Sequence, residues 1–403
     1  MRHTTFSLTV IAACATGAAT IAAMALNVAA SPTIAPKAVP HVVTHHVAAP
    51  AHKTTPKKPS AATSHKAASS NSSKSTVTGL KPQLTGLLNR TGVPPSAYRS
   101  AEGGYDIQGT SDNQGNRDVG DVTWAELQPT AGGPIAANNP IDKAIADVRA
   151  WNAANPTHPE ALKLRVEAGI HSPTWALNLG GTCFTVTDPT SGTSGCCPRF
   201  WTAQFSAAYY QFESELAAKY DSVPEIGEVD MAKNTTVYNE PLIRQIQSTS
   251  TVIALRAAGY TTAVDEQQQI QDIALLGTYW KHTRVGFAFN PYQTANPNTT
   301  NEAFTQQLIT SGRAALGDQL VLENNSIRQI LLTGRGSYQT MYAFMRQTGG
   351  PIGFQTATLA KVGSIQAVLI GAAAIGATSV ELPTGYQTQF TPAQLMAAGL
   401  ALT

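Results

Sequence analysis

The feature that most restricts the fold of this chain is an alternation of two kinds of segment from residue 77 to residue 403. Short runs with strand character alternate with longer segments whose apolar residues recur every three or four positions, as on one face of a helix. This order is typical of a parallel sheet with helices packed outside it. We therefore expect an α/β fold, a (β/α)8 TIM barrel, for which about 327 residues is an ordinary length.

Eight runs are predicted to be the strands of the barrel, and the first has the weakest strand character. They are residues 104–109, 121–127, 162–169, 226–232, 283–290, 319–325, 351–356 and 378–383. In such barrels the active site forms at the C-terminal ends of the strands. Polar and aromatic side chains follow these runs in the sequence, so we expect the site at that end.

The N-terminal part is of a different kind. Residues 1–30 have the layout of a secretory signal peptide, with a short basic start, an apolar run and small residues before a cleavage point after Ala30. The apolar run, residues 6–26, is also long enough to span a bilayer, so an N-terminal membrane anchor is the alternative. Residues 31–76 are mostly Ala, Pro, Ser, Thr, Lys and His, and are predicted to be a disordered linker. The expected location is secreted, extracellular or periplasmic.

The charges divide the chain in the same way. Residues 1–81 hold eight of the 27 Lys and Arg residues and none of the 25 Asp and Glu residues, which leaves the remainder with a net charge of −6. The basic linker suits contact with an anionic cell envelope. The mildly acidic globular part argues against nucleic acid as a partner.

Three of the four cysteines lie close together in one Gly-, Ser- and Thr-rich stretch, at Cys183, Cys196 and Cys197. In an exported protein this predicts a disulfide from Cys183 to one of the adjacent pair, with the third thiol left over. No further ligands lie nearby at zinc spacing, and no phosphate loop or dinucleotide fingerprint follows a predicted strand. We therefore expect neither a metal ion nor a cofactor.

Three segments carry a resemblance: WAELQPTAGG at 124–133, LRVEAGIHSPTWAL at 164–177 and ELAAKYDSVPEIGEVDMA at 215–232. They are similar to the segments after the second strand, at the third strand and around the fourth strand of clan A glycoside hydrolases. These are retaining (β/α)8 enzymes that include the family 42 β-galactosidases. The likeness covers most of residues 100–390 as scattered motifs. It implies hydrolysis of the O-glycosidic bonds of an oligo- or polysaccharide.

The resemblance also implies site residues. In that clan the general acid/base is a Glu that follows an Asn at the end of the fourth strand, and the matching pair is Asn239 and Glu240. The nucleophile is a Glu at the end of the seventh strand, where this chain has Gln355. Glutamine cannot form the glycosyl ester of a retaining mechanism. Either the seventh strand is misplaced, another carboxylate acts, or the barrel is not a retaining hydrolase. Glu240 as an ordinary loop carboxylate is the alternative.

A glycosidase needs a second carboxyl across the sugar from the first. Glu323 and Glu381 close the sixth and eighth predicted strands and are the expected partners of Glu240, with Glu323 slightly favoured. The alternative for Glu323 is a salt bridge at the barrel rim, with Arg328 as its partner. The alternative for Glu381 is a purely structural role.

Further residues near the predicted strand ends are expected at the site. Tryptophan rings stack on sugar faces, amides and tyrosines bind sugar hydroxyls, and a supporting carboxylate holds neighbouring groups by hydrogen bonds. The expected residues are Trp124, Glu126, His171, Trp175, Asn290 and Tyr292. For the tryptophans the alternative is packing, and for His171 it is a structural role.

The resulting hypothesis is an exported glycoside hydrolase with Glu240 as general acid/base. Its alternatives are a carbohydrate-binding barrel without catalysis, for which Gln355 is the motive, and an envelope-attached structural protein, for which the basic linker is the motive. The sequence does not specify the sugar, the linkage, the anomer, the choice between retention and inversion, or the oligomeric state.

Overall fold

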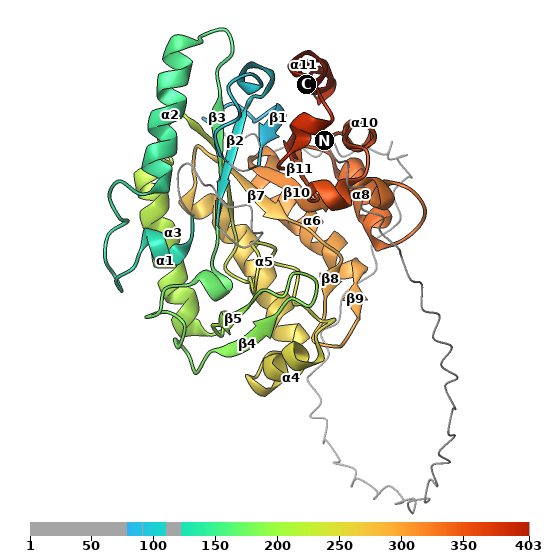
Figure 1. The fold of residues 1–403 in the computed structure, drawn as a ribbon. Helices are drawn as coiled ribbons and strands as arrows, with labels where there is room; N and C mark the ends of the chain where they lie inside the picture. Colours follow the sequence, from blue (N-terminus) through green and yellow to red (C-terminus); the bar gives the residue numbers. More distant parts are fainter. Residues whose placement is uncertain (1–78, 91, 110–121, 403) are drawn as a thin grey trace, which may run out of the picture. The chain divides into compact units, whose positions relative to one another are not determined.

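The computed structural model describes residues 79–90, 92–109 and 122–402. By contacts the chain separates into two units, residues 1–69 and residues 70–403, and everything described belongs to the second. The predicted signal peptide, membrane anchor and linker lie outside the described residues. The second unit is a closed barrel of eight parallel strands, as the sequence predicted (Figure 1).

The strands follow one another around the barrel in chain order, and the first pairs with the last through Gly86 and Ser379. They are β1 (Gly86–Asn89), β2 (Gly104–Gln108), β3 (Ala161–Val166), β6 (Ile226–Met231), β7 (Arg284–Ala288), β10 (Leu320–Ile327), β11 (Ile352–Thr356) and β12 (Ser379–Leu382). Two antiparallel hairpins lie outside the barrel sheet. They pair β4 (Phe184–Thr187) with β5 (Ser194–Cys197) and β8 (Tyr292–Gln293) with β9 (Thr300–Asn301).

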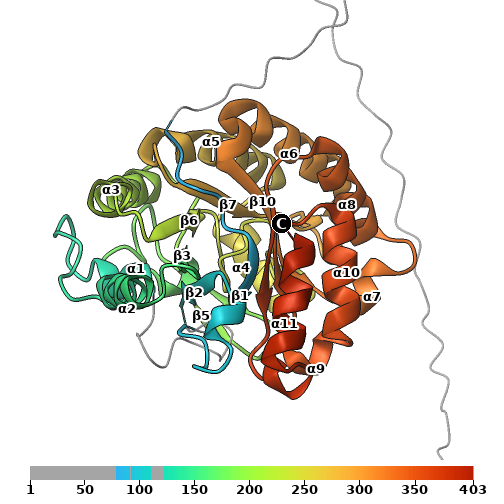
Figure 2. The same cartoon turned by 90° about the horizontal axis from the view of Figure 1, so that it is seen from above.

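Helices surround the strands, as the view from above shows (Figure 2). The longer ones are α2 (Pro140–Ala154), α3 (Ala203–Tyr220), α4 (Thr249–Ala257), α5 (Thr262–Tyr279), α6 (Glu302–Leu316), α8 (Ser337–Thr348), α10 (Ile365–Ile375) and α11 (Pro392–Gly399). Single-turn helices also occur, at α1 (Trp124–Leu127), α7 (Gln329–Leu332) and α9 (Leu359–Val362). Among the described helices, none combines the length and the apolar character needed to cross a bilayer.

The helix α6 shows how sequence spacing produces this arrangement. Its N-cap residue Asn301 accepts a hydrogen bond from the Phe304 amide and so satisfies one of the amides left open at the helix start. Phe304, Leu308 and Ile309 recur at helical spacing and are all buried. This apolar stripe faces the barrel and leaves the polar residues of the helix outside.

One predicted strand is wrong and one real strand was missed. Within the described part of 121–127, Thr123 forms only an isolated bridge to Glu167 and then caps α1 by accepting from the Glu126 amide. The real first strand, Gly86–Asn89, is four residues long, too short to show a period. The predicted first strand is therefore the second. The two errors cancel, so the third to eighth strands have the places predicted.

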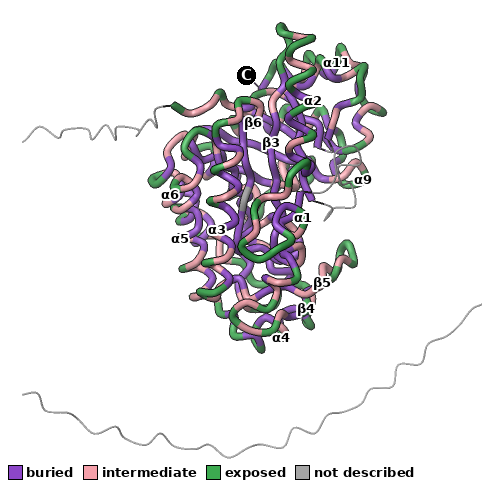
Figure 3. Tube along the Cα trace, turned by 90° about the vertical axis from the view of Figure 1, so that its left-hand side faces the viewer, coloured by how far each residue is buried: buried purple, intermediate pink, exposed green. Residues whose placement is uncertain are grey.

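Most residues of the barrel strands are buried, whichever face of the sheet they belong to, and the trace near β3 and β6 is largely coloured as buried (Figure 3). On β3, Leu162 and Leu164 are buried in the apolar core, whereas Lys163 and Arg165 reach carboxylates on strands across the barrel. The barrel interior, which in this fold is commonly filled by branched apolar side chains, therefore carries charge. Its ionisable residues are each at most 2 % exposed and are Asp106, Lys163, Arg165, Glu228, Asp230, Glu323 and Glu381.

Glycine makes room for these side chains. At Gly286 on β7, a Cβ would lie 2.1 Å from the Glu323 Oε1 atom and 3.3 Å from the Glu228 Oε1 atom. Contacts under 3 Å force neighbouring atoms to move, and both carboxylates are enclosed in the barrel. The small residue at this position is therefore part of how the charged interior fits.

Candidate functional site

A cavity of about 200 Å³ opens at the C-terminal ends of the barrel strands. Its walls come from residues that end or follow β1, β2, β3, β6, β10 and β11. This is the end at which barrels of this type carry their active sites. Of the residues expected from the sequence, the lining contains Asn239, Glu240 and Gln355.

Glu240 lies in the segment that follows β6 and presents a half-buried carboxyl to the cavity. Its Oε1 atom accepts a hydrogen bond of 3.2 Å from the Asn290 Nδ2 atom. Asn290 is held in that orientation because its Oδ1 atom accepts from Asn324 at 3.1 Å and from Tyr338 at 3.2 Å. Asn290 was expected at the site as a ligand for sugar hydroxyls, and here it also orients Glu240.

Burial raises the pKa of Glu240, and it outweighs the hydrogen bond from Asn290 and the charges of Arg165 and Arg90, which act in the opposite direction. A raised pKa keeps more of the carboxyl in the acid form near neutral pH. A protonated carboxylic acid at the edge of a cavity is the group that general acid catalysis requires.

Asn239 precedes Glu240 and is almost fully buried. Its Nδ2 atom donates to the carbonyl oxygen of Asp230 at 2.9 Å and to the Asp230 Oδ1 atom at 3.0 Å. These bonds fix the amide so that its Oδ1 atom, which has no hydrogen-bond partner within the described structure, is the remaining acceptor. The atom is buried at the wall of the cavity that Asn239 lines.

Glu323 and Glu381, the expected partners of Glu240, do not line the cavity. Lys163 Nζ lies 2.6 Å from Glu323 Oε1 and 2.8 Å from Glu381 Oε1. The predicted alternative of an ion pair between Glu323 and Arg328 is therefore wrong in its partner, which is Lys163. The structure brings Glu240 and Gln355 to one cavity and holds both of these carboxylates in the barrel interior.

Arg165 and Gln355 form the boundary between that interior and the cavity, because each lines the cavity and also contacts the buried carboxylates. Arg165 donates to Glu381 Oε1 at 2.7 Å and to Asp230 Oδ2 at 2.8 Å. Gln355 Nε2 donates to Glu381 Oε2 at 2.8 Å. Glu381 thus orients two groups of the cavity floor without reaching the cavity itself. Gln355 does end the seventh barrel strand, as predicted.

The carboxyls of the charged interior fall into two groups by the direction in which their pKa is shifted. Burial acts to raise the pKa of Glu381, but Arg165 and Lys163 outweigh it and hold the value at about 2. The pKa of Glu323 is likewise lowered, chiefly because the charge of Lys163 outweighs the effect of burial. Burial instead raises the pKa well above its usual range in the other three carboxyls, which are Asp106, Glu228 and Asp230. Two cations, Lys163 and Arg165, thus face the two carboxyls whose pKa is lowered, and the other three carboxyls are easier to protonate than usual.

The free energy of unfolding is expected to rise as the pH falls from 7.5 to 5.5. Burial raises the pKa of Glu102 and of Glu213 to about 8, so the folded chain holds protons that the unfolded chain releases above about 4.5. Stability from such groups is complete below the unfolded pKa and is lost as the pH rises through the folded pKa. Burial lowers the pKa of His171, so this residue acts in the opposite direction, but it is one group against two.

Urea unfolding followed by circular dichroism at the two pH values measures this difference, which is expected to be about 2 kcal/mol or more. The variant Glu213→Gln is expected to show a smaller difference because one titrating group is gone. Equal stability at both pH values, or greater stability at pH 7.5, would contradict the protonated state of these buried carboxyls.

The remaining expected residues lie outside the cavity lining. Trp124 is fully buried, and its ring packs edge to face against that of Trp175, with 5.4 Å between the ring centroids. Tyr292 is buried and donates to Asp265 Oδ2 at 2.9 Å. His171 is half-buried, with its Nε2 atom 3.5 Å from Glu167 Oε2, and Glu126 is exposed on α1. For Trp124 and Tyr292 these surroundings favour packing over sugar contact.

Sequence reasoning did not select several residues that line the cavity. One is a carboxylate, Glu167, which closes the third predicted strand, and the others are cations that end or follow strands. Their only signal was this position at a strand end, which many polar residues share. They are Arg90, Arg165, Glu167, Arg328 and Lys361.

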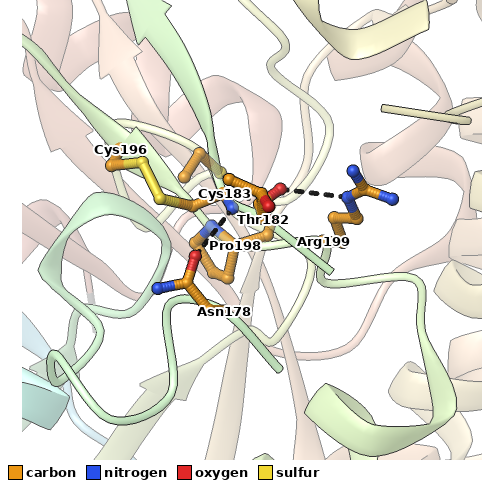
Figure 4. Close-up of a disulfide and its surroundings, with 7 residues drawn as sticks. Asn178, Thr182, Cys183, Cys196, Pro198 and Arg199 are labelled. Carbon is orange, nitrogen blue, oxygen red and sulfur yellow. Dashed lines mark hydrogen bonds between the residues drawn. A yellow bond between two sulfur atoms is a disulfide. The ribbon is translucent and has the colours of Figure 1, made fainter. Parts of the chain in front are cut away.

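The predicted disulfide is confirmed, and Cys196 is the partner of Cys183 (Figure 4). It joins the two sides of the β4–β5 hairpin, and Cys197 remains as a buried thiol. The turn of this hairpin reaches the cavity, where Tyr238 Oη donates to Asp188 Oδ2 at 2.5 Å beside Ser191. The disulfide therefore stabilises a segment that forms part of the cavity wall.

Across the residues that the structure describes, no three His, Cys, Asp or Glu side chains gather in a way that would hold a metal ion. The lining of the cavity offers carboxyl, guanidinium, ammonium and amide groups.

No protein-family model and no curated protein matches the sequence. Among solved structures, the catalytic domain of a β-amylase from Paenibacillus polymyxa is similar, with 12% identity, a TM-score of 0.45, and coverage of 79% of this chain and 100% of that one. A β-galactosidase from Halorubrum lacusprofundi has 11% identity and a TM-score of 0.41, with coverage of 74% and 52%. A β-galactosidase from Rahnella sp. R3 has 12% identity and a TM-score of 0.39, with coverage of 80% and 57%. The chain spans about half the length of these two β-galactosidases.

These three similar structures are glycoside hydrolases, whereas membership of family 42 is not shown. The identities are too low to carry an activity to this chain. What the chain does is therefore inferred from its own cavity.

Proposed function

We propose that this chain acts on carbohydrate and hydrolyses an O-glycosidic bond with Glu240 as the general acid. The observation that carries the proposal is the Glu240 carboxyl, half-buried at a cavity on the C-terminal side of the barrel and oriented by Asn290. Burial raises its pKa, which suits proton donation to a departing glycosidic oxygen. The buried acceptor on Asn239, which has no partner among the described residues, suits a substrate rich in hydroxyl groups.

Hydrolysis needs a second carboxyl, and within the described cavity lining the other one is Glu167. It ends the strand next to β6 and stands beside His171. We assign Glu167 the role of activating water or of attacking the sugar. Glu323 and Glu381 then act indirectly, because their contacts hold Lys163, Arg165 and Gln355 in place.

Gln355 supports a second candidate function, a barrel that binds saccharide without cleaving it. The residue lies at the end of the seventh strand, where the resemblance implied the nucleophile. It lines the cavity with an amide in place of a carboxylate, and this amide donates to Glu381. A glutamine there cannot form a covalent sugar ester. The hydrolase proposal therefore depends on Glu167, and the binding proposal does not.

One experiment separates the two. The protein is incubated with a panel of α- and β-linked oligosaccharides, products are followed by chromatography, and binding is measured by calorimetry. Release of shorter saccharides supports the hydrolase, and the anomer of the first product shows whether Glu167 activates water or attacks the sugar. Binding without product supports the binding barrel. Absence of both would remove carbohydrate as the ligand class.

We also propose that the protein works outside the cytoplasm, in contact with the cell envelope. The disulfide between Cys183 and Cys196 supports this, because such bonds persist in oxidising compartments. The signal-like residues 1–30 and the basic residues 31–76 are its sequence basis. Fractionation of cells that express the chain, followed by immunodetection, tests it, and recovery in the cytoplasmic fraction alone would contradict it.

A further inference from the structure

The cavity wall carries more positive than negative side chains. Of the cations, one directly follows the first barrel strand, one lies in the third, and two lie in the segments after the sixth and seventh. The cations are Arg90, Arg165, Arg328 and Lys361, and the carboxyl groups are Glu167 and Glu240. The lining therefore holds four cations against two carboxyl groups.

Two of these cations take part in none of the ion pairs among the described residues. Arg165 is neutralised by the carboxylates beneath it, whereas Arg328 and Lys361 form no ion pair with any residue in the described part of the chain. Arg328 directly precedes α7, after β10, and Lys361 lies in α9, after β11. Since β10 and β11 are neighbours in the barrel, both cations belong to one side of the cavity.

The cavity lining also contains two hydrogen-bond acceptors without a partner. They are the Asn325 Oδ1 atom, on a residue three positions before Arg328, and the Asn239 Oδ1 atom, and neither has a partner within the described residues. Amide oxygens accept from hydroxyl groups, whereas guanidinium and ammonium groups donate to anions. A ligand that satisfies both sets carries hydroxyl groups and a negative charge together.

We propose that the saccharide bound in this cavity carries an anionic group, a carboxylate or a phosphate, which Arg328 and Lys361 recognise. The inference rests on the proposed function and names its substrate class. The sugar hydroxyls donate to Asn239 and Asn325, and the anionic group lies toward α7 and α9. A neutral sugar makes the first set of contacts and lacks the second.

Calorimetry at low ionic strength tests this with matched probes: D-glucuronate against D-glucose, D-galacturonate against D-galactose, and D-glucose 6-phosphate as the phosphate arm. We expect at least one anionic probe to bind about tenfold more tightly than its neutral counterpart, the gain typical of a charged hydrogen bond. The arm with the larger gain identifies carboxylate or phosphate. The advantage is expected to shrink in 0.5 M salt (about 4 Å screening length), because Lys361 is exposed.

The variants Arg328→Gln and Lys361→Gln are expected to lose the advantage of the anionic probe and to keep the affinity for the neutral one. Lys143→Gln, which removes an exposed charge on α2 outside the cavity, is the matched control and is expected to change neither. Equal binding of neutral and anionic probes would overturn the anionic class and leave carbohydrate binding intact. Binding of no probe, together with no hydrolysis in the oligosaccharide panel, would overturn both proposals.

Discussion

Replacing Lys163 by methionine is expected to lower the free energy of unfolding by about 3–5 kcal/mol, the cost of removing one partner from a buried ion pair. Lys163 Nζ contacts three carboxyl groups, at 2.6 Å (Glu323), 2.8 Å (Glu381) and 3.2 Å (Glu228). Without it, two carboxylates face Arg165 alone, and one must bind a proton or remain buried and uncompensated. Domain stabilities are commonly about 5–15 kcal/mol, so the loss is large. Urea unfolding measures it.

The exposed Lys143 on α2 provides the control, and Lys143→Met is expected to change stability by less than about 0.5 kcal/mol. The double variant Lys163→Met/Glu323→Gln removes one cation and one anion together. It is expected to recover part of the loss, because the interior is again balanced. If Lys163→Met behaves like the control, or if the double variant loses the sum of the two single losses, the charge pairing described for the barrel interior is incorrect.

The barrel was predictable because periodicity is a local property. Runs such as 162–169 and 226–232 alternate or stay apolar over enough residues to be identified, and the structure confirms strands at both. The strand Gly86–Asn89 offered only two apolar residues, so it carried no period. The segment 121–127 looked like a strand, but Thr123 caps a helix there, and capping depends on a single side chain.

The site was predictable only in part, because the sequence shows which residues end a strand but not how deep each one lies. The β10 strand continues to Ile327, so Glu323 is in its interior and not at its end. Glu381 is close to the end of β12, but Arg165 from β3 and Gln355 from β11 both contact it from the side of the cavity. Depth in a barrel is set by strand register and by long side chains from other strands, which no local pattern records.

Cations were missed for a related reason. Lys163 and Arg165 alternate with leucines on β3, which is the pattern of a strand with one polar face. Only the structure shows that this polar face points into the barrel, where Lys163 pairs with Glu323 and Arg165 pairs with Glu381. Carboxylates that looked catalytic from their positions are, in the structure, partners of these two cations. Glu240 does line the cavity, at the place after the fourth strand and beside the Asn that the sequence indicated.

Replacing Glu240 by glutamine is expected to lower kcat by about 10²–10⁴-fold on any oligosaccharide that the protein cleaves, the usual contribution of a general acid. Glutamine keeps the shape and the contact with Asn290 but has no proton to give. The thermal midpoint is expected to stay nearly unchanged, because the amide has the shape of the carboxyl and keeps its contact with Asn290. Glu266→Gln on α5, outside the cavity, is the matched control and should leave kcat unaltered.

The pH profile separates a general acid from a group that only binds. Because the acid form is active, activity is expected to fall as the pH rises through the raised pKa of Glu240. This falling limb of the pH profile is expected to disappear in Glu240→Gln. The hydrogen bond from Asn290 lowers the pKa of Glu240, so Asn290→Ala is expected to move the same limb to higher pH. An unchanged limb in both variants would show that another group donates the proton, and Glu240 would then be a binding residue of the cavity.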